Sequence, residues 1–220
     1  MKISASILSI EKENATQKFY NLEVANIDYF HIDVMDGKFV KRNTSELMKD
    51  YAMTIKHISQ TPLDVHLMVE DLEYYINEYL DLKPQYITFH YEANMDKKEI
   101  FKRINLIKEN GVRAGISIKP NTDVEEILEF LPYISLVLVM SVEPGEGGQE
   151  FILTTVNKIK KIREYIDENN LETDIEVDGG INNETASLIE KAGADIAVVG
   201  TYLVNSENYE KEVANLRKIE

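Results

Sequence analysis

The sequence is dominated by a regular alternation of two kinds of segment. Short runs rich in β-branched and other apolar residues are separated by longer stretches with helical spacing and many Glu and Lys residues. Parallel neighbours in a sheet need crossover connections, which helices usually supply, so this alternation predicts a parallel sheet. Eight apolar runs are recognisable as strands: Lys2–Leu8, Asp28–Val34, Leu63–Met68, Tyr86–His90, Val112–Ile118, Ile134–Met140, Asp174–Asp178 and Asp195–Gly200.

The intervening stretches predict the helices and the class of fold. Asn110-Gly111 and Ala192-Gly193 are expected to end two helices, because glycine tolerates the left-handed conformation of a C-cap. Eight strand–helix units leave about 27 residues for each, which suits an α/β fold, a single-domain TIM (β/α)8 barrel over residues 1–220. The helical stretches are Asp71–Leu82, Lys97–Asn110, Val124–Leu131, Phe151–Asn170 and Glu184–Ala192.

A doubly wound open sheet is the alternative architecture. The dinucleotide signature of that fold, G-x-G-x-x-G after the first strand, is absent, and Ser6-Ile7-Leu8-Ser9 stands in its place. No linker, low-complexity tract or shift of composition marks a second domain. The barrel is therefore the prediction.

Charge and composition exclude several classes of function. The formal net charge is −15 and no basic stripe is visible, which argues against nucleic acid or an anionic membrane surface as a partner. The absence of cysteine excludes a disulfide scaffold, a Cys nucleophile and a thiolate metal site. The longest apolar run, Ile134–Met140, is far shorter than the roughly 20 residues that span a bilayer. With no recognisable signal peptide, a cytoplasmic location is the expectation.

Polar side chains at the ends of three predicted strands are the first candidates for a site. Chemistry in a barrel occurs at the carboxyl ends of the strands. Because strand side chains alternate with period two, His31 and Asp33 share a face of the second strand. His66 lies on the third strand and Asp178 ends the seventh. Two imidazoles and two carboxylates suit one divalent cation of the Zn, Fe, Mn or Co type.

Glycine-rich turns follow the last three predicted strands. Glycines there let backbone N–H groups face inward and hold an anion, in the region where barrels commonly bind phosphate. A tight turn explains any one of these pairs, but three consecutive loops favour an anion site. The residues concerned are Gly145, Glu146, Gly147, Gly148, Gly179, Gly180, Gly200 and Thr201.

Five segments together resemble the motifs of the ribulose-phosphate 3-epimerase family. They occur in the family's order and the resemblance covers nearly the whole chain. Several long, separate motifs form a specific signal where a single motif would not. The segments are Ala5–Leu8, His31–Val40, Leu63–Val69, Val139–Phe151 and Glu176–Ile181.

The resemblance implies a TIM barrel with a divalent metal that interconverts D-ribulose 5-phosphate and D-xylulose 5-phosphate. Asp33 and Asp178 would be the two acid/base groups, flanking a planar enediolate. The partner would be a small phosphorylated sugar, and a homo-oligomer stays open. By motif position, the metal ligands would be His31, Asp33, His66 and Asp178. The residues in contact with the sugar would be Ser6, His66, Met35, Met68 and Met140, and those in contact with the phosphate would be the residues of the glycine-rich turns given above.

The sequence departs from the family's pattern in several places. Lys41–Thr44 stands where Pro-Asn is usual, Glu143 where Asn is usual, Glu146 where an aromatic Phe is usual, and Thr201 where Ser is usual. Sister enzymes that act on D-allulose 6-phosphate share the catalytic motifs, so the resemblance leaves the length of the sugar open. It also leaves the identity of the metal open, because His/Asp sites accept several divalent ions.

Two functions of other classes are alternatives to the epimerase. A catalytically silent phosphosugar-binding barrel has no need of two opposed bases, so the Asp33/Asp178 pair argues against it. A Schiff-base aldolase would use Lys119, at the end of the fifth predicted strand. His90 is expected to be a packed or supporting residue rather than a ligand, and His57 a surface residue.

Overall fold

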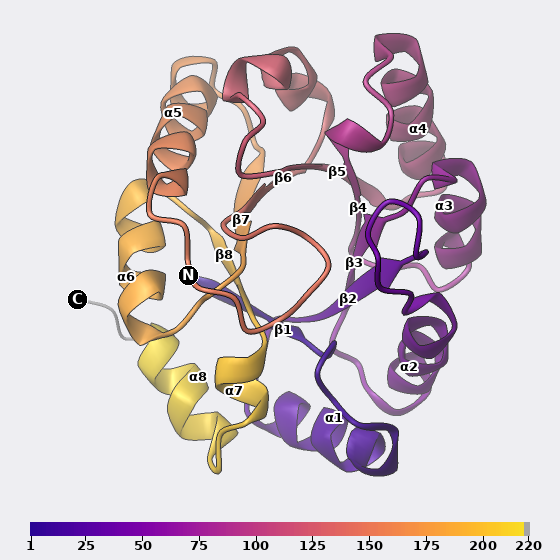
Figure 1. Ribbon diagram of the computed structural model, residues 1–220, viewed down its shortest axis with the longest axis vertical. Helices are drawn as coiled ribbons and strands as arrows, with labels where there is room; N and C mark the ends of the chain where they lie inside the picture. The colour runs from indigo at the N-terminus through magenta and orange to yellow at the C-terminus, as the bar shows by residue number, and fades with distance from the viewer. Residues whose placement is uncertain (218–220) are drawn as a thin grey trace.

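Eight parallel strands close into one barrel in the computed structural model, which describes residues 1–217 (Figure 1). The ring is completed by β1 pairing with β8, with Lys2 opposite Ile196, so the open sheet is excluded and the TIM barrel is confirmed. The strands are β1 (Lys2–Ser6), β2 (Tyr29–Met35), β3 (Leu63–Met68), β4 (Tyr86–His90), β5 (Arg113–Ile118), β6 (Leu136–Met140), β7 (Asp174–Asp178) and β8 (Ile196–Val199).

Helices surround the barrel and supply the crossovers between its strands (Figure 1). Within residues 1–217, no helix combines the length and the apolar character needed to cross a membrane. The helices are α1 (Ala15–Val24), α2 (Ser45–Ile58), α3 (Leu72–Leu80), α4 (Lys97–Glu109), α5 (Thr155–Glu168), α6 (Asn183–Ala192), α7 (Thr201–Val204) and α8 (Tyr209–Arg217), with short 3-10 turns η1 (Lys12–Asn14), η2 (Tyr91–Ala93), η3 (Val124–Glu126) and η4 (Leu128–Tyr133).

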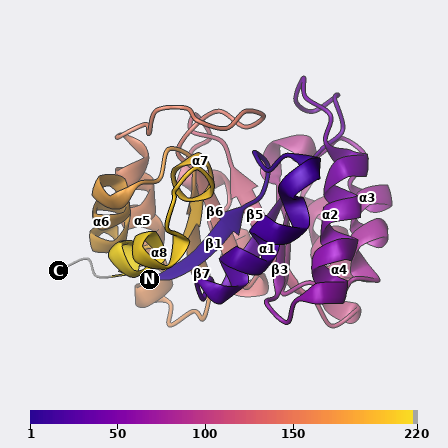
Figure 2. The ribbon, with the colours of Figure 1, turned by 90° about the horizontal axis from the view of Figure 1, so that it is seen from below.

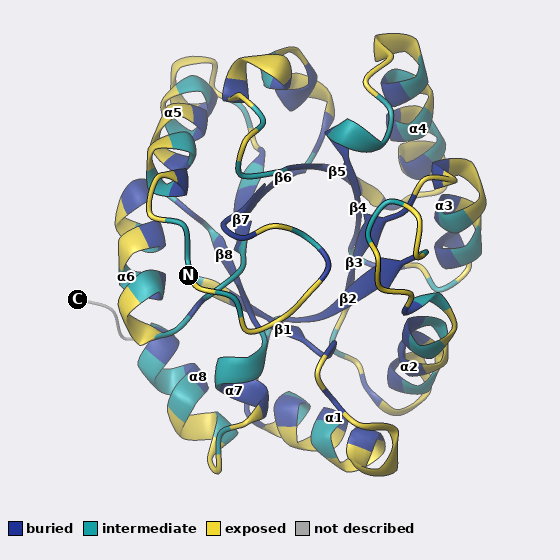
Figure 3. Cartoon of the chain, in the orientation of Figure 1, coloured by how far each residue is buried: buried dark blue, intermediate teal, exposed yellow. Residues whose placement is uncertain are grey.

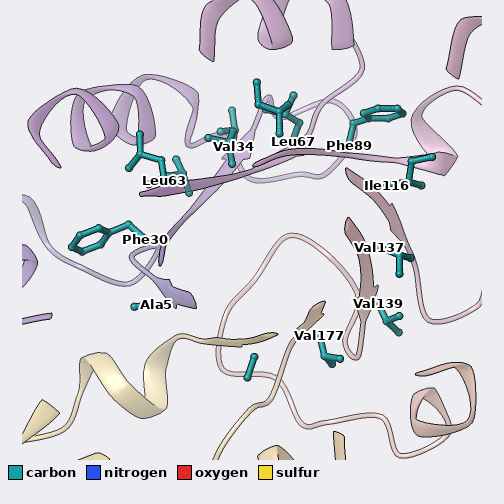
Figure 4. Close-up of a cluster of buried hydrophobic side chains, with 14 of the residues drawn as sticks. Ala5, Phe30, Val34, Leu63, Leu67, Phe89, Ile116, Val137, Val139 and Val177 are labelled. Carbon is teal, nitrogen blue, oxygen red and sulfur yellow. The ribbon is translucent and has the colours of Figure 1, made fainter. Parts of the chain in front are cut away.

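The main apolar core lies between the strands and the helices. Val34, Leu67 and Phe89 point outward from their strands toward the helical layer and are fully buried (Figure 4). The strands are dark blue in Figure 3, whereas yellow, exposed residues gather on the outer faces of the helices. Because strand side chains alternate, filling this layer with apolar residues leaves every second strand residue to face the barrel interior.

One predicted helix is wrong and another starts later than expected. The segment Val124–Leu131 forms the 3-10 turns η3 and η4 instead of an α-helix. Pro132, inside η4, has no backbone N–H and its ring crowds the preceding turn, which disfavours a regular α-helix. The helix expected from Phe151 begins at Thr155, because Ile152 N–H donates to the Ser141 carbonyl (2.8 Å) and closes the preceding loop.

Two loops rise above the carboxyl ends of the strands, at the same end of the barrel (Figure 2). We call them the β2 loop (residues 36–44) and the β6 loop (residues 141–154). They touch: Gly145 has φ +122°, and a Cβ added there would lie 3.2 Å from the Cβ of Val40. Glycine therefore allows the β6 loop to pass close to the β2 loop above the barrel opening.

Candidate active site

A cavity of about 530 Å³ lies at the carboxyl ends of the strands, bordered by the β6 loop. It is the position that a TIM barrel reserves for chemistry. All residues that the sequence predicts to contact the sugar or the phosphate line this cavity except His66, which is fully buried. The structure therefore brings the residues predicted to contact the sugar and those predicted to contact the phosphate to the same cavity.

Two imidazoles and two carboxylates converge at the inner end of the cavity. His31 Nε2 lies 3.3 Å from Asp33 Oδ1 and 4.0 Å from Asp178 Oδ2. His66 Nδ1 lies 3.4 Å and 3.9 Å from the same two oxygens. One donor atom from each of the four side chains lies within 4.8 Å of all the others. Strands β2, β3 and β7 supply them, as the alternation of strand side chains predicts.

The four donors fit a divalent cation. Within the described residues, His31 Nε2 and His66 Nδ1 are buried and have no hydrogen-bond partner. The separations between these nitrogens and the aspartate oxygens are longer than hydrogen bonds. A tetrahedral shell with bonds of about 2.1 Å has edges of about 3.4 Å. Donor type, orphaned nitrogens and spacing thus agree with one ion of the Zn, Fe, Mn or Co type.

Asp64, which sequence reasoning missed, holds the other nitrogen of His31. Its Oδ2 lies 2.6 Å from His31 Nδ1 and also accepts a hydrogen bond from Ser4 Oγ (2.8 Å). Burial opposes protonation of His31, but the charges of Asp64 and Asp33 outweigh it, and the pKa of the imidazole lies well above its ordinary value. Asp64 precedes His66 by one strand period, so side-chain alternation alone could have found it.

His66 is held by a different kind of partner. Its Nε2 lies 2.9 Å from Nε2 of His90, whose Nδ1 lies 3.1 Å from Glu92 Oε2. Burial lowers the pKa of His90 to about 4 and also lowers the pKa of His66. The structure thus places His90, expected to be a packed or supporting residue, in contact with the outer nitrogen of His66 and not among the four donors.

The two aspartates have opposite electrostatic surroundings. For Asp33, burial is outweighed by the adjacent His31 imidazole, which holds the pKa of the carboxyl well below its usual range. Ser6 Oγ also donates to Asp33 Oδ2 (2.7 Å). For Asp178, burial and then the nearby charge of Asp33 raise the pKa of the carboxyl to about 7. In the metal-free protein near neutral pH, one carboxyl is therefore ionised while the other retains a proton for part of the time.

Thioethers form part of the cavity wall around these polar groups. Met35 and Met68 pack together with Leu8, against Phe39 and Val40 of the β2 loop. Met140 lies in a second small apolar cluster. Methionine side chains are polarizable and apolar, so this wall keeps bulk water from the polar cluster.

The glycine-rich turns form the outer end of the cavity. Gly179 has φ +120°, and a Cβ added there would lie 2.5 Å from a methyl carbon of Val142, so the close approach of the two loops requires glycine. Cβ atoms added at Gly147 and Gly148 would lie 3.9 Å and 4.0 Å from Cγ2 of Thr201. The turns after β6 and β8 are therefore neighbours.

The changed segment of the β2 loop is tied firmly to the site. Thr44 Oγ1 donates to the Asp33 carbonyl (2.7 Å) and accepts from the Met35 N–H (3.0 Å).

Lys119 lies outside the cavity, with Nζ 4.2 Å from the centroid of the Phe39 ring, and His57 is exposed on α2. Neither residue contributes to the cluster of four donors.

Comparisons with known proteins find one family along most of the chain. The profile of the Ribulose-phosphate 3 epimerase family matches residues 2–204. A protein of Methanocaldococcus jannaschii named ribulose-phosphate 3-epimerase is 40% identical over 218 residues, which cover 99% of this chain and 90% of the relative. Proteins of the same name from Bacillus subtilis (36% over 218 residues, 99% and 98% covered) and Helicobacter pylori (35% over 219 residues, 100% and 98% covered) are also similar.

Solved structures of more distant proteins share the fold. A 3-hexulose-6-phosphate synthase has a TM-score of 0.72 at 15% identity, with 99% of this chain and 98% of that chain covered. A Streptococcus mutans protein described as KGPDC has a TM-score of 0.70 at 12% identity, with 99% and 98% covered. At these identities the likeness concerns the barrel alone.

Proposed function

The chain belongs to the ribulose-phosphate 3-epimerase family, a family of carbohydrate isomerases that act on phosphosugars, and from this premise we propose that it interconverts D-ribulose 5-phosphate and D-xylulose 5-phosphate. The names of these three similar relatives support this pentulose phosphate as the substrate. The reaction inverts C3 of a 2-ketose, where the adjacent C2 carbonyl makes the C3 proton removable.

One observation carries the proposal: Asp33 from β2 and Asp178 from β7 lie at the inner end of one cavity, each within 4.0 Å of both imidazoles. In the metal-free protein the pKa of Asp33 is held well below its usual range, whereas the pKa of Asp178 is raised to about 7. A pair of titratable groups whose surroundings separate their pKa values is the arrangement expected of a base and an acid. A phosphosugar binder without catalytic activity would not require such a pair.

The two carboxyls move protons on opposite faces of the sugar. In one direction the ionised aspartate takes the C3 proton, and the C3–H electron pair forms the C2–C3 double bond of an enediolate. The protonated aspartate then donates its proton to C3 from the other face, which inverts the centre. The reverse reaction exchanges the two roles. Each transfer requires the donor or acceptor oxygen within hydrogen-bond reach of C3.

We further propose that one divalent ion of the Zn, Fe, Mn or Co type is held by His31, Asp33, His66 and Asp178. When bound, the ion supplies electrostatic stabilisation for negative charge that develops on the substrate oxygens during deprotonation. The residues around it orient the sugar and exclude water. Ser6 and His66 contact the sugar in this proposal, while Met35, Met68 and Met140 cover the reacting carbon.

The phosphate is assigned to the glycine-rich end of the cavity. Backbone N–H groups of Gly145–Gly148, Gly179-Gly180 and Gly200-Thr201 would surround it, together with the Thr201 hydroxyl. The phosphate is remote from C3, so its binding energy orients the ketose rather than altering its chemistry. Glu146, an exposed residue of this loop, would contribute its backbone N–H and not its carboxylate, which would repel the anion.

The decisive experiment compares kcat/KM for D-ribulose 5-phosphate and D-allulose 6-phosphate on the same metal-loaded preparation. We expect turnover of the pentulose phosphate to be favoured, with deuterium from heavy water incorporated at C3 of the product. Preference for the hexulose phosphate would correct the substrate and keep the chemistry. Absence of turnover of both sugars with all four ions would overturn the proposed function.

Metal removal gives a second test. Dialysis against a strong chelator is expected to abolish epimerisation, and addition of Zn²⁺, Mn²⁺, Co²⁺ or Fe²⁺ is expected to restore it. Circular dichroism before and after dialysis checks that the barrel stays folded. Full activity in protein that elemental analysis shows to be metal-free would eliminate the role assigned to the four donors.

A further inference from the structure

His66 can serve the cluster only if its proton is on the correct nitrogen. Its Nδ1 faces Asp33 and Asp178, and its Nε2 faces His90 at 2.9 Å. A neutral imidazole carries one proton, so one ring nitrogen donates and the other has a free lone pair. A cation ligated by Nδ1 therefore requires the proton of His66 to be on Nε2.

We propose that His90 and Glu92 are positioning residues that hold the proton of His66 on Nε2 by a directed chain of hydrogen bonds. In this chain His66 Nε2–H donates to His90 Nε2, and His90 Nδ1–H donates to Glu92 Oε2. The inference rests on the metal site of the proposed function. It assigns a task to two residues that lie outside the cluster of donors.

The direction of this chain of hydrogen bonds is set by Glu92, at the end farthest from His66. Glu92 Oε1 accepts from the Lys119 N–H (2.7 Å) and from the Thr122 hydroxyl. As an ionised carboxylate, Glu92 has no proton to offer, so its Oε2 accepts from Nδ1 of His90 at 3.1 Å. A second proton on His90 would place a cation in a fully buried ring, which is unfavourable. Nε2 of His90 is therefore left as an acceptor.

Neighbouring side chains hold both the ring of His90 and the segment that binds Glu92. The ring of His90 lies edge to edge with His66 (centroids 5.0 Å apart, planes at 31°) and beside Phe39 of the β2 loop (5.0 Å, 40°). The segment that binds Glu92 is fixed by Lys158, whose Nζ donates to the Lys119 and Thr122 carbonyls. The ring of His90 thus has little freedom to rotate and exchange its nitrogens.

A relay through a neutral ring suits the charge of this site. His31 is oriented directly by Asp64, so three aspartates, Asp33, Asp64 and Asp178, already lie within 4.0 Å of the His31 ring. Another carboxylate in direct contact with His66 would add repulsion in a buried environment. His90 transmits the hydrogen-bond direction of Glu92 while keeping the Glu92 charge one ring farther away. Different partners for the two histidines are therefore expected on electrostatic grounds.

The test is the imidazole ¹⁵N NMR spectrum of the metal-free protein. The chain has four histidines, so the spectrum contains four ring systems, and His57→Gln helps to assign them. In the wild type we expect the proton of His66 on Nε2. Glu92→Gln replaces one carboxylate oxygen with an amide NH₂. The amide oxygen keeps the position that accepts from the Lys119 N–H and the Thr122 hydroxyl, so the NH₂ faces His90 Nδ1, which then has to act as an acceptor. We expect the proton of His66 to move wholly or partly to Nδ1.

The same variants are titrated with cobalt(II) chloride and followed by visible absorption. Loss of an outer partner of a ligating histidine typically weakens metal binding about 10- to 100-fold, which is the rise in Kd expected for Glu92→Gln. Glu126→Gln is the matched control: Glu126 accepts from the Tyr91 hydroxyl (2.8 Å) and has no path to His66. Its tautomers and cobalt affinity are expected to equal those of the wild type.

A second variant covers the case in which Glu92→Gln does not fold. His90→Phe keeps an aromatic ring beside Phe39 but removes both nitrogens, and we expect it to lose the single tautomer of His66 and a similar factor in cobalt affinity. An unchanged His66 tautomer, or a cobalt Kd within twofold of the wild type, in a folded variant overturns the relay. Neither measurement uses a sugar, so the relay is judged even if the protein fails to epimerise.

Discussion

The two ends of the barrel interior are built from the same strands but have opposite characters. At the amino ends, Tyr29, Tyr86, Leu136 and Ile196 form a buried apolar layer, which we call the floor. At the carboxyl ends, His31, Asp33, His66 and Asp178 form what we call the mouth. A single strand shows the contrast: β2 contributes Tyr29 to the floor, and His31 and Asp33 to the mouth.

The difference lies in how the polar atoms are satisfied. In the floor, the Tyr86 hydroxyl donates to Asp174 Oδ2 (2.8 Å), and the rings of Tyr29 and Tyr86 pack edge to face at 5.7 Å. In the mouth, His31 Nε2 and His66 Nδ1 have no partner among the described residues. The floor therefore stabilises the barrel, whereas the mouth holds groups whose partners are expected to be a cation and a substrate.

The largest predicted effect is at the mouth. Asp33→Asn or Asp178→Asn should lower kcat by about 10³-fold or more, because each removes one acid/base group and one carboxylate ligand. Steady-state assay of the metal-loaded variants measures the loss, and circular dichroism checks the fold. Asp174→Asn, in the floor end of the same strand as Asp178, serves as the matched control with unchanged kcat. Near wild-type turnover in either mouth variant would contradict the two-base assignment.

The floor is expected to respond in stability rather than activity. Leu136→Ala removes most of a fully buried side chain, which costs about 2–5 kcal/mol of unfolding free energy in well-packed cores. Urea unfolding measures this loss, and kcat/KM at 25 °C should stay within twofold of the wild type. Met140→Leu, at the mouth end of the same strand, should show the converse pattern of small stability change and reduced activity. A large loss of activity in Leu136→Ala would show that the two ends are coupled.

The two mouth aspartates should also change metal-free stability in opposite directions. The pKa of Asp178 is raised to about 7, so its contribution is present below its ordinary value near 4 and is lost as pH rises through 7. The pKa of Asp33 is lowered, so its contribution is present above its ordinary value and is lost on acidification. At pH 8, chelated Asp178→Asn should unfold at higher urea than the wild type, and Asp33→Asn at lower urea. Shifts of the same sign would refute the electrostatic description.

Side-chain alternation made the mouth largely predictable from sequence. A buried parallel strand turns every second residue inward, so His31, Asp33 and His66 could be placed without coordinates. What alternation cannot supply is the partner of each nitrogen. His90 and Asp64 also follow the inward pattern, but only distances show that one contacts Nε2 of His66 and the other Nδ1 of His31.

The wrong prediction of a helix over Val124–Leu131 has a different physical reason. Val124–Leu131 has helical spacing, but a segment this short is marginal as an α-helix and is decided by its ends. Pro132 follows directly, and the chain has to return to β6 within a few residues. Val124 and Leu131 are buried, so the segment does pack against the core, but the predicted α-helical backbone is wrong.

The smallest predicted effect concerns the β6 loop, which borders the cavity above the mouth. Gln149 Nε2 donates to the carbonyls of Glu143 (2.7 Å) and Glu146 (2.8 Å) and so holds the loop in its curve. Gln149→Ala removes two hydrogen bonds worth about 0.5 kcal/mol each, about 1 kcal/mol together, which predicts a rise in KM of about fivefold with little change in kcat. Gln17→Ala on α1, which removes a comparable exposed amide contact to Asn21, should leave KM unchanged. A fall in kcat as large as the rise in KM would instead assign Gln149 to the chemical step, and would extend the mouth from its buried donors into the loop above them.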